Sequence, residues 1–186
     1  MPSKMGKSGQ EEAPFELLIA VVVMTFVITI GLYAVNVLRD KQCEGELEKS
    51  LGDLQQAIQI VANGQGTQTV TFAIPSCYQE TEGVTETKIS YEQETHTCTY
   101  YCGSYRNECT LLKFYNPEHS TSKCLFISSS TAFTSDSCTD FSREEGYEVV
   151  NWHNSIISSG RYTLISKFNA FSSNPVLCVY KKILGG

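Results

Sequence analysis

The feature that most constrains this chain is an apolar run near its N-terminus, from Leu17 to Val35, that contains no charged residue. Asn36-Val37-Leu38 extends the run, and Arg39-Asp40-Lys41 ends it. Its large apolar residues occur all round a helical cylinder, whereas a surface helix of a soluble domain has them along one stripe. At about 1.5 Å per residue, a helix from Leu17 to Leu38 reaches roughly 33 Å, close to the about 30 Å of a hydrocarbon core. The run therefore predicts one membrane-spanning helix.

The charges that flank the run and the positions of the cysteines predict its orientation. Lys4 and Lys7 precede the run, and lysines set topology more strongly than carboxylates do, so we expect the N-terminus to be cytoplasmic. Arg39 and Lys41 on the other side weaken this argument. All of the cysteines except the first follow Ser76, and such a dense set of thiols indicates an oxidising exterior.

The residues before the run carry a more specific pattern. Lys7-Ser8-Gly9-Gln10 is followed by acidic residues and then by Phe15-Glu16-Leu17-Leu18. A secretory signal peptide would instead have a shorter apolar region and a small-residue cleavage site after it. This pattern resembles the leader of archaeal type IV pilin-like proteins. Together with the helix, the resemblance covers roughly the first third of the chain.

This resemblance implies the roles of three residues. A dedicated prepilin peptidase would cut between Gly9 and Gln10 on the cytoplasmic side and leave the apolar helix in the mature protein. Glu16 would then meet the new N-terminal amine of a neighbouring subunit, which Gln10 would carry. The family usually has this glutamate immediately before the phenylalanine, whereas Glu16 follows Phe15. Alternatively, Glu16 is a glutamate at the level of the headgroups that stays hydrated.

Beyond the membrane the apolar pattern changes to a stripe. Leu47, Leu51, Leu54, Ile58 and Val61 recur at spacings of four and three, which predicts an amphipathic helix with one buried face. We expect the stripe to dock on a sheet of the head, with Leu54 buried and Gln55 on the opposite side. Asn63-Gly64-Gln65-Gly66 predicts the end of the helix. The expected organisation is a cleaved cytoplasmic leader at 1–9, a transmembrane and assembly helix at 10–38, an amphipathic extension at 39–65 and an extracellular β-rich head at 66–186.

The head is rich in short segments of Thr, Tyr, Phe, Val and Ile, which favour strands. Strands are predicted at 69–74, 84–91, 95–101, 110–115, 123–127, 161–168 and 176–183. Segment 147–155 fits a strand or a helix, and 128–142 is typical of a long surface loop. The aromatic candidates for the core are Trp152, Phe72, Phe114, Phe126, Phe168 and Phe171. The predicted fold class is α+β, with a long N-terminal transmembrane and amphipathic helix packed on a disulfide-bonded antiparallel β-rich head, as in pilins.

The even number of cysteines predicts structural disulfides, although the sequence leaves their pairing open. The candidates are Cys43, Cys77, Cys98, Cys102, Cys109, Cys124, Cys138 and Cys178. Cys43 would find a partner only if the head folds down on the helix. A zinc site formed by Cys98, Cys102 and Cys109 with His96 or His119 is the alternative. Zinc ribbons and redox helices both use Cys-x-x-Cys, however, and the closest pair here is Cys-x-x-x-Cys.

Nothing in the sequence predicts catalysis. His96, His119 and His153 occur without a Gly-x-Ser-x-Gly or His-Glu-x-x-His motif, and Glu144-Glu145 beside Gly146 is typical of a solvated turn. The net charge of −6 and the lack of a basic patch argue against nucleic-acid binding. We therefore expect no enzyme activity, no catalytic residue, no cofactor and no metal.

The resemblance implies a structural subunit of a type IV pilus-like surface filament that assembles through its apolar helix. Its partners would be the membrane, copies of itself or other pilin subunits, the prepilin peptidase and the pilus assembly machinery. It would lie in the cell membrane before assembly, with the head outside, and in an extracellular filament afterwards. The alternative is a single-pass, membrane-anchored surface binding module, such as a minor pilin or adhesin, that does not itself polymerise.

Overall fold

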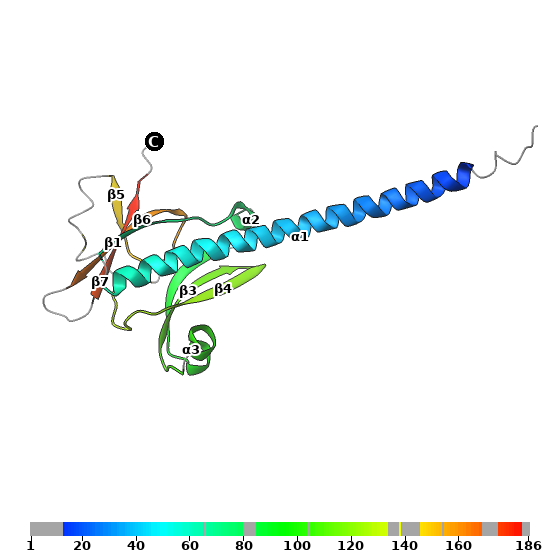
Figure 1. Ribbon diagram of the computed structural model, residues 1–186. Coiled ribbons are helices and arrows are strands. Elements are labelled where there is room, and N and C mark those ends of the chain that lie inside the picture. Colours follow the sequence, from blue (N-terminus) through cyan, green and yellow to red (C-terminus); the bar gives the residue numbers. More distant parts are fainter. Residues whose placement is uncertain are drawn as a thin grey trace, which may run out of the picture. The chain divides into compact units, whose positions relative to one another are not determined.

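A computed structural model of the chain describes residues 13–64, 66–79, 85–103, 105–133, 138, 146–153, 155–168 and 175–183. The chain forms two compact units, Met1–Glu44 and Gly45–Gly186. One helix, α1 (Ala13–Ala62), has its N-terminal part in the first unit and its last turns in the second, which also contains all the described strands (Figure 1). The extension predicted at 39–65 is therefore mostly part of the head unit. The predicted α+β class, a long apolar helix with disulfide-bonded antiparallel β-structure, is confirmed.

The two ends of α1 follow the local sequence. Pro14 lies in the first turn, where its missing N–H would have had no partner within the helix. The helix ends at Ala62, and Gly64 adopts a left-handed conformation with φ 81°. In that conformation the Gly64 N–H donates to the carbonyl of Val61 at 3.0 Å. The stop predicted at this glycine is confirmed, because glycine takes a positive φ without steric cost.

Four strands form one antiparallel sheet, sheet A, in the order β1-β6-β7-β5. Its strands are β1 (Thr67–Phe72), β5 (Tyr147–Val150), β6 (Gly160–Phe168) and β7 (Pro175–Lys182). β1 pairs with β6, so that Val70 lies opposite Tyr162. Both side chains are buried, and the inner face of the sheet contributes much of the core.

Three consecutive strands form a second antiparallel sheet, sheet B, in the order β2-β3-β4. They are β2 (Glu86–Glu92), β3 (Cys109–Asn116) and β4 (His119–Leu125). The described part of the head also contains two short helices, α2 (Ser76–Gln79) and α3 (Thr95–Cys102). The segment after β5 runs along the free edge of β2. His153 forms a parallel bridge with Ile89, and the N–H of Ile157 donates to the carbonyl of Thr87 at 2.6 Å. This segment therefore joins the two sheets and covers an edge that would otherwise expose unpaired backbone groups.

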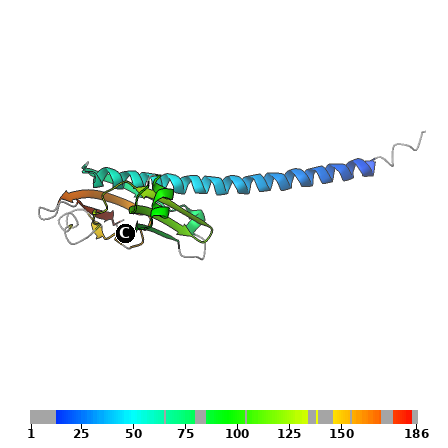
Figure 2. The same ribbon diagram turned by 90° about the horizontal axis from the view of Figure 1, so that it is seen from below.

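The last turns of α1 pack against the strands through the predicted stripe. Within the head unit they lie along one side of the strands (Figure 2). The five stripe residues are all completely buried: Leu47, Leu51, Leu54, Ile58 and Val61. Polar contacts flank the stripe on both sides. The Ser50 hydroxyl accepts a hydrogen bond from the N–H of Ala73, just after β1, and Glu48 forms an ion pair with Lys123 on β4. The predicted docking of the stripe is confirmed.

The prediction that Gln55 faces away from the head is wrong. Its side chain is half-buried, and its Nε2 donates to the backbone carbonyl of Cys124 at 2.6 Å. Gln59, one turn later, donates to the same carbonyl at 3.3 Å. The physical reason is that β4 is an edge strand of sheet B. The carbonyl of Cys124 receives no donor from β3, so it needs one from another part of the head.

The predicted strand at 95–101 is also wrong, because these residues form helix α3. The helix ends at Gly103, which has φ 66° and donates its N–H to the carbonyl of Thr99 at 3.0 Å. The threonines and tyrosines of this segment favour strands, but strand propensity is easily overridden by packing and covalent links.

Two disulfides provide that override. Cys98 and Cys102 lie four residues apart, and thus on one face of α3. Cys98 is bonded to Cys109 on β3, and Cys102 is bonded to Cys124 on β4. These four cysteines and Leu111 form a buried cluster between the helix and the outer face of sheet B. In a strand, residues four apart also point to one face, but they lie about 13 Å apart, roughly twice their separation on a helix, so both sulfurs could not reach this compact cluster.

Three of the aromatic core candidates are confirmed. Trp152 and Phe72 are completely buried, and Phe114 is nearly so. The Trp152 ring packs edge to face on Tyr162 of β6, with 5.1 Å between centroids, and Phe114 packs in the same manner on Tyr78 at 5.4 Å. Edge-to-face pairs of this kind add stability beyond the apolar area that they bury.

Phe126 is not a core residue, contrary to the prediction, because it is 48% exposed. It follows Leu125, the buried last residue of β4, and successive side chains of an extended segment point to opposite sides. The guanidinium of Arg106 lies 5.9 Å from its ring centroid instead. The side-chain environment of Phe168, and Phe171 as a whole, lie outside the described residues.

The other strand predictions are confirmed with shifted ends. β4 begins earlier than predicted, because Pro117-Glu118 makes a tight turn after β3. The ambiguous segment 147–155 begins as strand β5, and α2 was not predicted at all. In the predicted loop, residues 128–133 contain only a bridge from Ala132 to Val176, and most of 134–142 lies outside the described residues.

Candidate functional site: the apolar segment of α1

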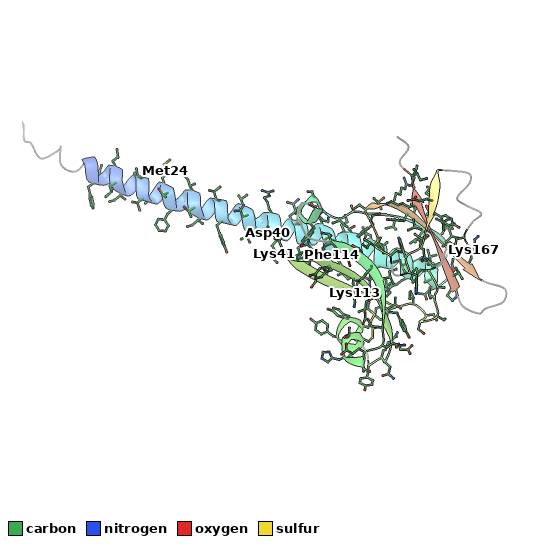
Figure 3. The ribbon with its side chains drawn as sticks, turned by 180° about the vertical axis from the view of Figure 1, so that it is seen from behind. Met24, Asp40, Lys41, Lys113, Phe114 and Lys167 are labelled. Carbon is green, nitrogen blue, oxygen red and sulfur yellow. A yellow bond between two sulfur atoms is a disulfide. The ribbon has the colours of Figure 1, made fainter. Side chains whose placement is uncertain are left out.

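The N-terminal part of α1 presents an apolar surface on every side. Each large apolar residue from Phe15 to Leu38 is exposed, and Met24, which is 69% exposed, is an example (Figure 3). Soluble proteins rarely expose apolar patches larger than a few hundred Å², and larger ones mark contacts with lipid or protein. We call Phe15 to Leu38 the apolar segment.

Two threonine hydroxyls inside the apolar segment are satisfied locally. The hydroxyl of Thr25 donates to the carbonyl of Val21 at 2.8 Å, and that of Thr29 donates to the carbonyl of Thr25 at the same distance. The backbone groups are bonded within the helix. Groups that enter hydrocarbon must be satisfied in this way, because lipid tails offer no partner.

By length and composition, α1 is a candidate membrane-spanning helix near the N-terminus. Arg39, Asp40 and Lys41 follow the apolar segment, and the ammonium of Lys41 lies 2.7 Å from the carboxylate of Glu44. Both side chains of that pair are substantially exposed. The helix therefore changes at Leu38 from a run without charged residues to a segment with several. Such a change is typical of a helix that leaves a membrane.

Glu16 lies in the first turn of α1, and its side chain is exposed. Acidic side chains are favourable in this position because of the positive end of the helix dipole. Gly9 and Gln10, the residues of the predicted cleavage site, lie outside the described residues.

The disulfide candidates are all accounted for. The disulfide bonds within the head include Cys98 to Cys109, Cys102 to Cys124 and Cys138 to Cys178. None of the eight cysteines, which all lie among the described residues, is free. The zinc alternative at Cys98, Cys102 and Cys109 is wrong, because sulfurs in disulfides cannot act as thiolate ligands.

The histidines are dispersed over the head. His96 is on α3, and His119 packs beside the rings of Tyr78 and Phe114, whose centroids lie 5.7 and 6.4 Å from its own. His153 lies in the segment that joins the sheets. Among the described residues there is no group of three His, Cys, Asp or Glu side chains that could hold a metal ion. Glu144 and Glu145 lie outside those residues.

One ion pair on the outer face of sheet B has a clear electrostatic effect. Hydrogen bonds from Lys113 at 2.6 Å and from the Ser90 hydroxyl at 2.8 Å lower the pKa of Glu92 below its ordinary value of 4.5. Both partners lie on paired strands, which fixes the geometry. The pair is a feature of the head.

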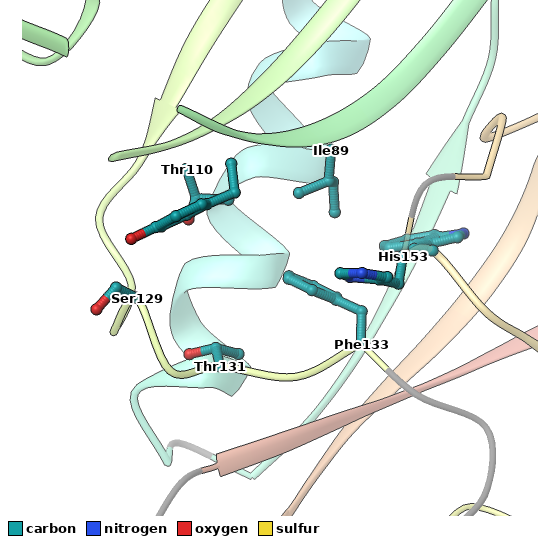
Figure 4. Close-up of a pocket in the computed structure, with 8 residues that line it drawn as sticks. Ile89, Thr110, Ser129, Thr131, Phe133 and His153 are labelled. Carbon is teal, nitrogen blue, oxygen red and sulfur yellow. The ribbon is translucent and has the colours of Figure 1, made fainter. Parts of the chain in front are cut away.

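Sequence reasoning missed a pocket between sheet B and two connecting segments (Figure 4). Its walls include Tyr91, Thr131 and His153, which had no assigned role, and Trp152, which was expected only as a core residue. The single tryptophan was the one available signal. Comparisons of the chain with protein families, with curated proteins and with solved structures give no match.

Proposed function

We propose that this chain is a structural subunit of a type IV pilus-like surface filament. The observation that carries the proposal is the apolar segment, which is exposed on every side and continues in the same helix into a stripe that is buried in the head. A helix of this kind suits two environments in turn, lipid before assembly and a bundle of neighbouring apolar helices afterwards.

The filament would form by bundling the apolar segments of many copies, with the heads on the outside. Small and hydroxylated residues, here Thr25, Gly31 and Ala34, let helix backbones approach closely in a bundle. Glu16 would meet the amine that Gln10 carries after cleavage in a neighbouring copy. A carboxylate beside an apolar segment is costly to bury unless it is paired, so this contact would favour one register between copies.

The first test is cleavage. The proposal predicts that the surface protein begins at Gln10, which mass spectrometry of the intact protein can decide. Gly9→Leu should block the peptidase, so that the chain keeps residues 1–9 and no filament forms. Gly6→Leu, in the same leader but away from the bond, is the matched control and should be processed normally. A native protein that keeps the leader, or that has lost the helix, would exclude this function.

The second test is assembly. Cells that produce the chain should release long filaments on shearing, visible by electron microscopy and containing the mature protein. Glu16→Gln should reduce the yield of filaments strongly, whereas Glu11→Gln, a nearby carboxylate outside the apolar segment, should not. If the processed protein stays with the membrane fraction under shear, the alternative function applies, a single-pass membrane-anchored surface binding module.

A further inference from the structure

The free edge of β1 is the least protected strand edge in the described part of the head. β1 lies at one end of sheet A and pairs only with β6, so the backbone groups on its other side have no partner within the sheet. Such an edge can pair with a strand of another chain. Proteins usually block it with charged residues, a short strand, proline or a covering segment.

The other edge strands in the described part of the head have such protection. The segment after β5 covers β2, and the side chains of Gln55 and Gln59 donate to β4. β5 is only four residues long and contains Glu148. β1 is six residues long, and it is the only described strand without a charged side chain. An uncharged edge of this length, without proline, stays open to another strand.

Two hydrogen bonds just after β1 show which of its backbone groups point to the free edge. The N–H of Ala73 donates to the Ser50 hydroxyl on α1 at 2.9 Å, and the N–H of Ile74 donates to the Ser159 hydroxyl, beside β6, at 2.9 Å. Successive residues of a strand direct their backbone groups to opposite sides. By this alternation, the three exposed threonines of β1 direct their N–H and C=O groups away from β6: Thr67, Thr69 and Thr71.

The contact between Thr69 and Thr163 supports this assignment. The two residues lie directly opposite each other on β1 and β6, and their hydroxyls are 3.3 Å apart. In an antiparallel pair, opposite side chains approach most closely where the two residues do not exchange backbone hydrogen bonds. The backbone groups of Thr69 therefore face the free edge.

A groove of about 420 Å³ lies between β1 and the last turns of α1. Residues 68–71 line it from β1, and Asp53, Gln56, Ala57 and Ile60 line it from α1. Ala57 is buried and Ile60 is half-buried, whereas Asp53 and Gln56 are exposed. The groove therefore offers space beside the edge for the side chains of an added strand, with both an apolar and a polar part.

We propose that β1 pairs antiparallel with β1 of a second copy of this chain. In the register that forms most hydrogen bonds, Thr69 lies opposite Thr69 of the second copy, and Thr67 lies opposite its Thr71. All three resulting pairs have backbone groups that face the seam, and each can exchange two hydrogen bonds. Threonine side chains directly opposite each other also interact favourably. The proposal goes beyond the filament function and does not depend on it.

Charge favours a second β1 over the other strands of the chain. The net charge of −6 makes two copies repel, so they approach best through an uncharged edge. Two β1 strands bring no like charges together, because neither contains a charge. Pairing with β5 would instead bring Glu148 towards the groove that contains Asp53. A contact of β1 with β1 is two-fold and closed, so it gives dimers.

The groove accepts the inward side chains of the second β1. In the proposed register, Val70 of the second copy lies opposite Gln68, and Gln68 of the second copy lies opposite Val70. α1 and β1 run in opposite directions, because the turn at Gly64 joins them. Val70 of the second copy therefore comes closer to Ile60, in the apolar part, and its Gln68 comes closer to Asp53, which can accept from the amide.

Opposite charges at one position test both the contact and its register. Thr69→Lys would place two lysines opposite each other at the centre of the seam, and Thr69→Glu would place two glutamates there. Each variant should raise the Kd of the dimer by about 5- to 10-fold. When the two variants are mixed, a lysine faces a glutamate, and a heterodimer should form at least as tightly as the unchanged dimer. Thr99→Lys, at an exposed position on α3, is the matched control and should dimerise like the unchanged protein.

The measurement is sedimentation equilibrium of the full-length protein in density-matched detergent, which gives the mass of the protein alone. Detergent is kept in large excess, so that two apolar segments rarely share a micelle by chance. The unchanged protein should show a dimer that dissociates on dilution. Thr69→Pro removes an N–H that faces the seam but no bond to β6, so it should abolish the dimer and leave the urea midpoint of the monomer nearly unchanged.

Three results would overturn the proposal. A protein that is monomeric at every concentration would leave the edge of β1 to a strand of a different protein. Thr69→Lys and Thr69→Glu dimers as tight as the unchanged dimer would show that copies associate elsewhere, for example through the apolar segment. A mixture that dimerises no better than either variant alone would exclude the register. None of these results affects the cleavage and shearing tests, so the filament function is judged separately.

Discussion

Three adjacent positions on α1 should respond very differently to alanine, because they lie at different depths against the head. Leu54 is completely buried in the middle of the stripe. Gln55 is half-buried and bonded to the carbonyl of Cys124, and Gln56 is exposed. The series Leu54→Ala, Gln55→Ala and Gln56→Ala therefore tests the docking of α1 within a single turn of helix.

The expected magnitudes follow from these environments. Leu54→Ala removes a fully buried side chain and leaves a cavity, and should lower the free energy of unfolding by about 2–5 kcal/mol. Gln55→Ala removes one hydrogen bond and should cost about 1 kcal/mol or less, because Gln59 still donates to the same carbonyl. Gln56→Ala should remain within about 0.5 kcal/mol of the unchanged protein.

Trp152 emission provides the assay, since the only tryptophan lies in the head. Urea unfolding of the full-length protein in mild detergent gives each free energy from the midpoint and slope. A loss of about 3 kcal/mol should also lower Tm by about 6–12 °C in a chain of this size. If Leu54→Ala were no more costly than Gln56→Ala, the stripe would not pack on the sheets, and its burial would have to come from neighbouring subunits.

Three further predictions concern the head. Replacing Cys102 and Cys124 together by serine removes a link across 22 residues and should lower the free energy of unfolding in urea by about 3 kcal/mol. Peptide mapping of the unchanged protein under non-reducing conditions should find this disulfide, and a different pairing would contradict the fold of α3. Gly103→Ala should destabilise by about 1–2 kcal/mol, because φ at this helix end is 66°, and an unchanged midpoint would show that the helix end can rearrange. The lowered pKa of Glu92 means that its contribution to stability is complete above about pH 4.5 and is lost as the pH falls through the folded-state pKa. Lys113→Met should therefore flatten the pH dependence of the unfolding free energy below pH 4.5, and an unaltered slope would mean that the pair contributes nothing.

The parts of the fold that were predictable are those in which a periodic apolar pattern and a burial pattern coincide. Leu47 to Val61 repeats every three or four residues, and no other arrangement buries all five side chains on one side. The β3 strand alternates around a buried Phe114, and its ends are marked by a cysteine and by Pro117. Gly64 is a strong stop because few other residues adopt its φ.

The parts that were not predictable depend on contacts between residues far apart in the chain. Segment 95–101 has strand propensity, and only the bonds of Cys98 and Cys102 to two different strands show why it is a helix. Gln55 faces β4 because of an edge carbonyl some seventy positions later, at Cys124. The pocket forms where two connecting segments meet sheet B, and no local pattern marks such a place.

The order of strands in sheet A has a consequence for how the head is made. Sheet B joins neighbours along the chain, so it can form as soon as Leu125 is available. Sheet A pairs β1 with β6, with Thr69 and Thr163 separated by 94 residues, and one of its two interior positions is taken by β7, the last described strand. Pairings over such distances form slowly, because a long loop must close before any contact compensates for it. Until residues 175–182 arrive, β6 has only one neighbour and β5 has none, and the chain exposes unpaired strand edges of the kind that aggregate. The head is therefore at its most vulnerable during the interval between synthesis of Leu125 and synthesis of β7, when one sheet is finished and the other still lacks one of its two central strands.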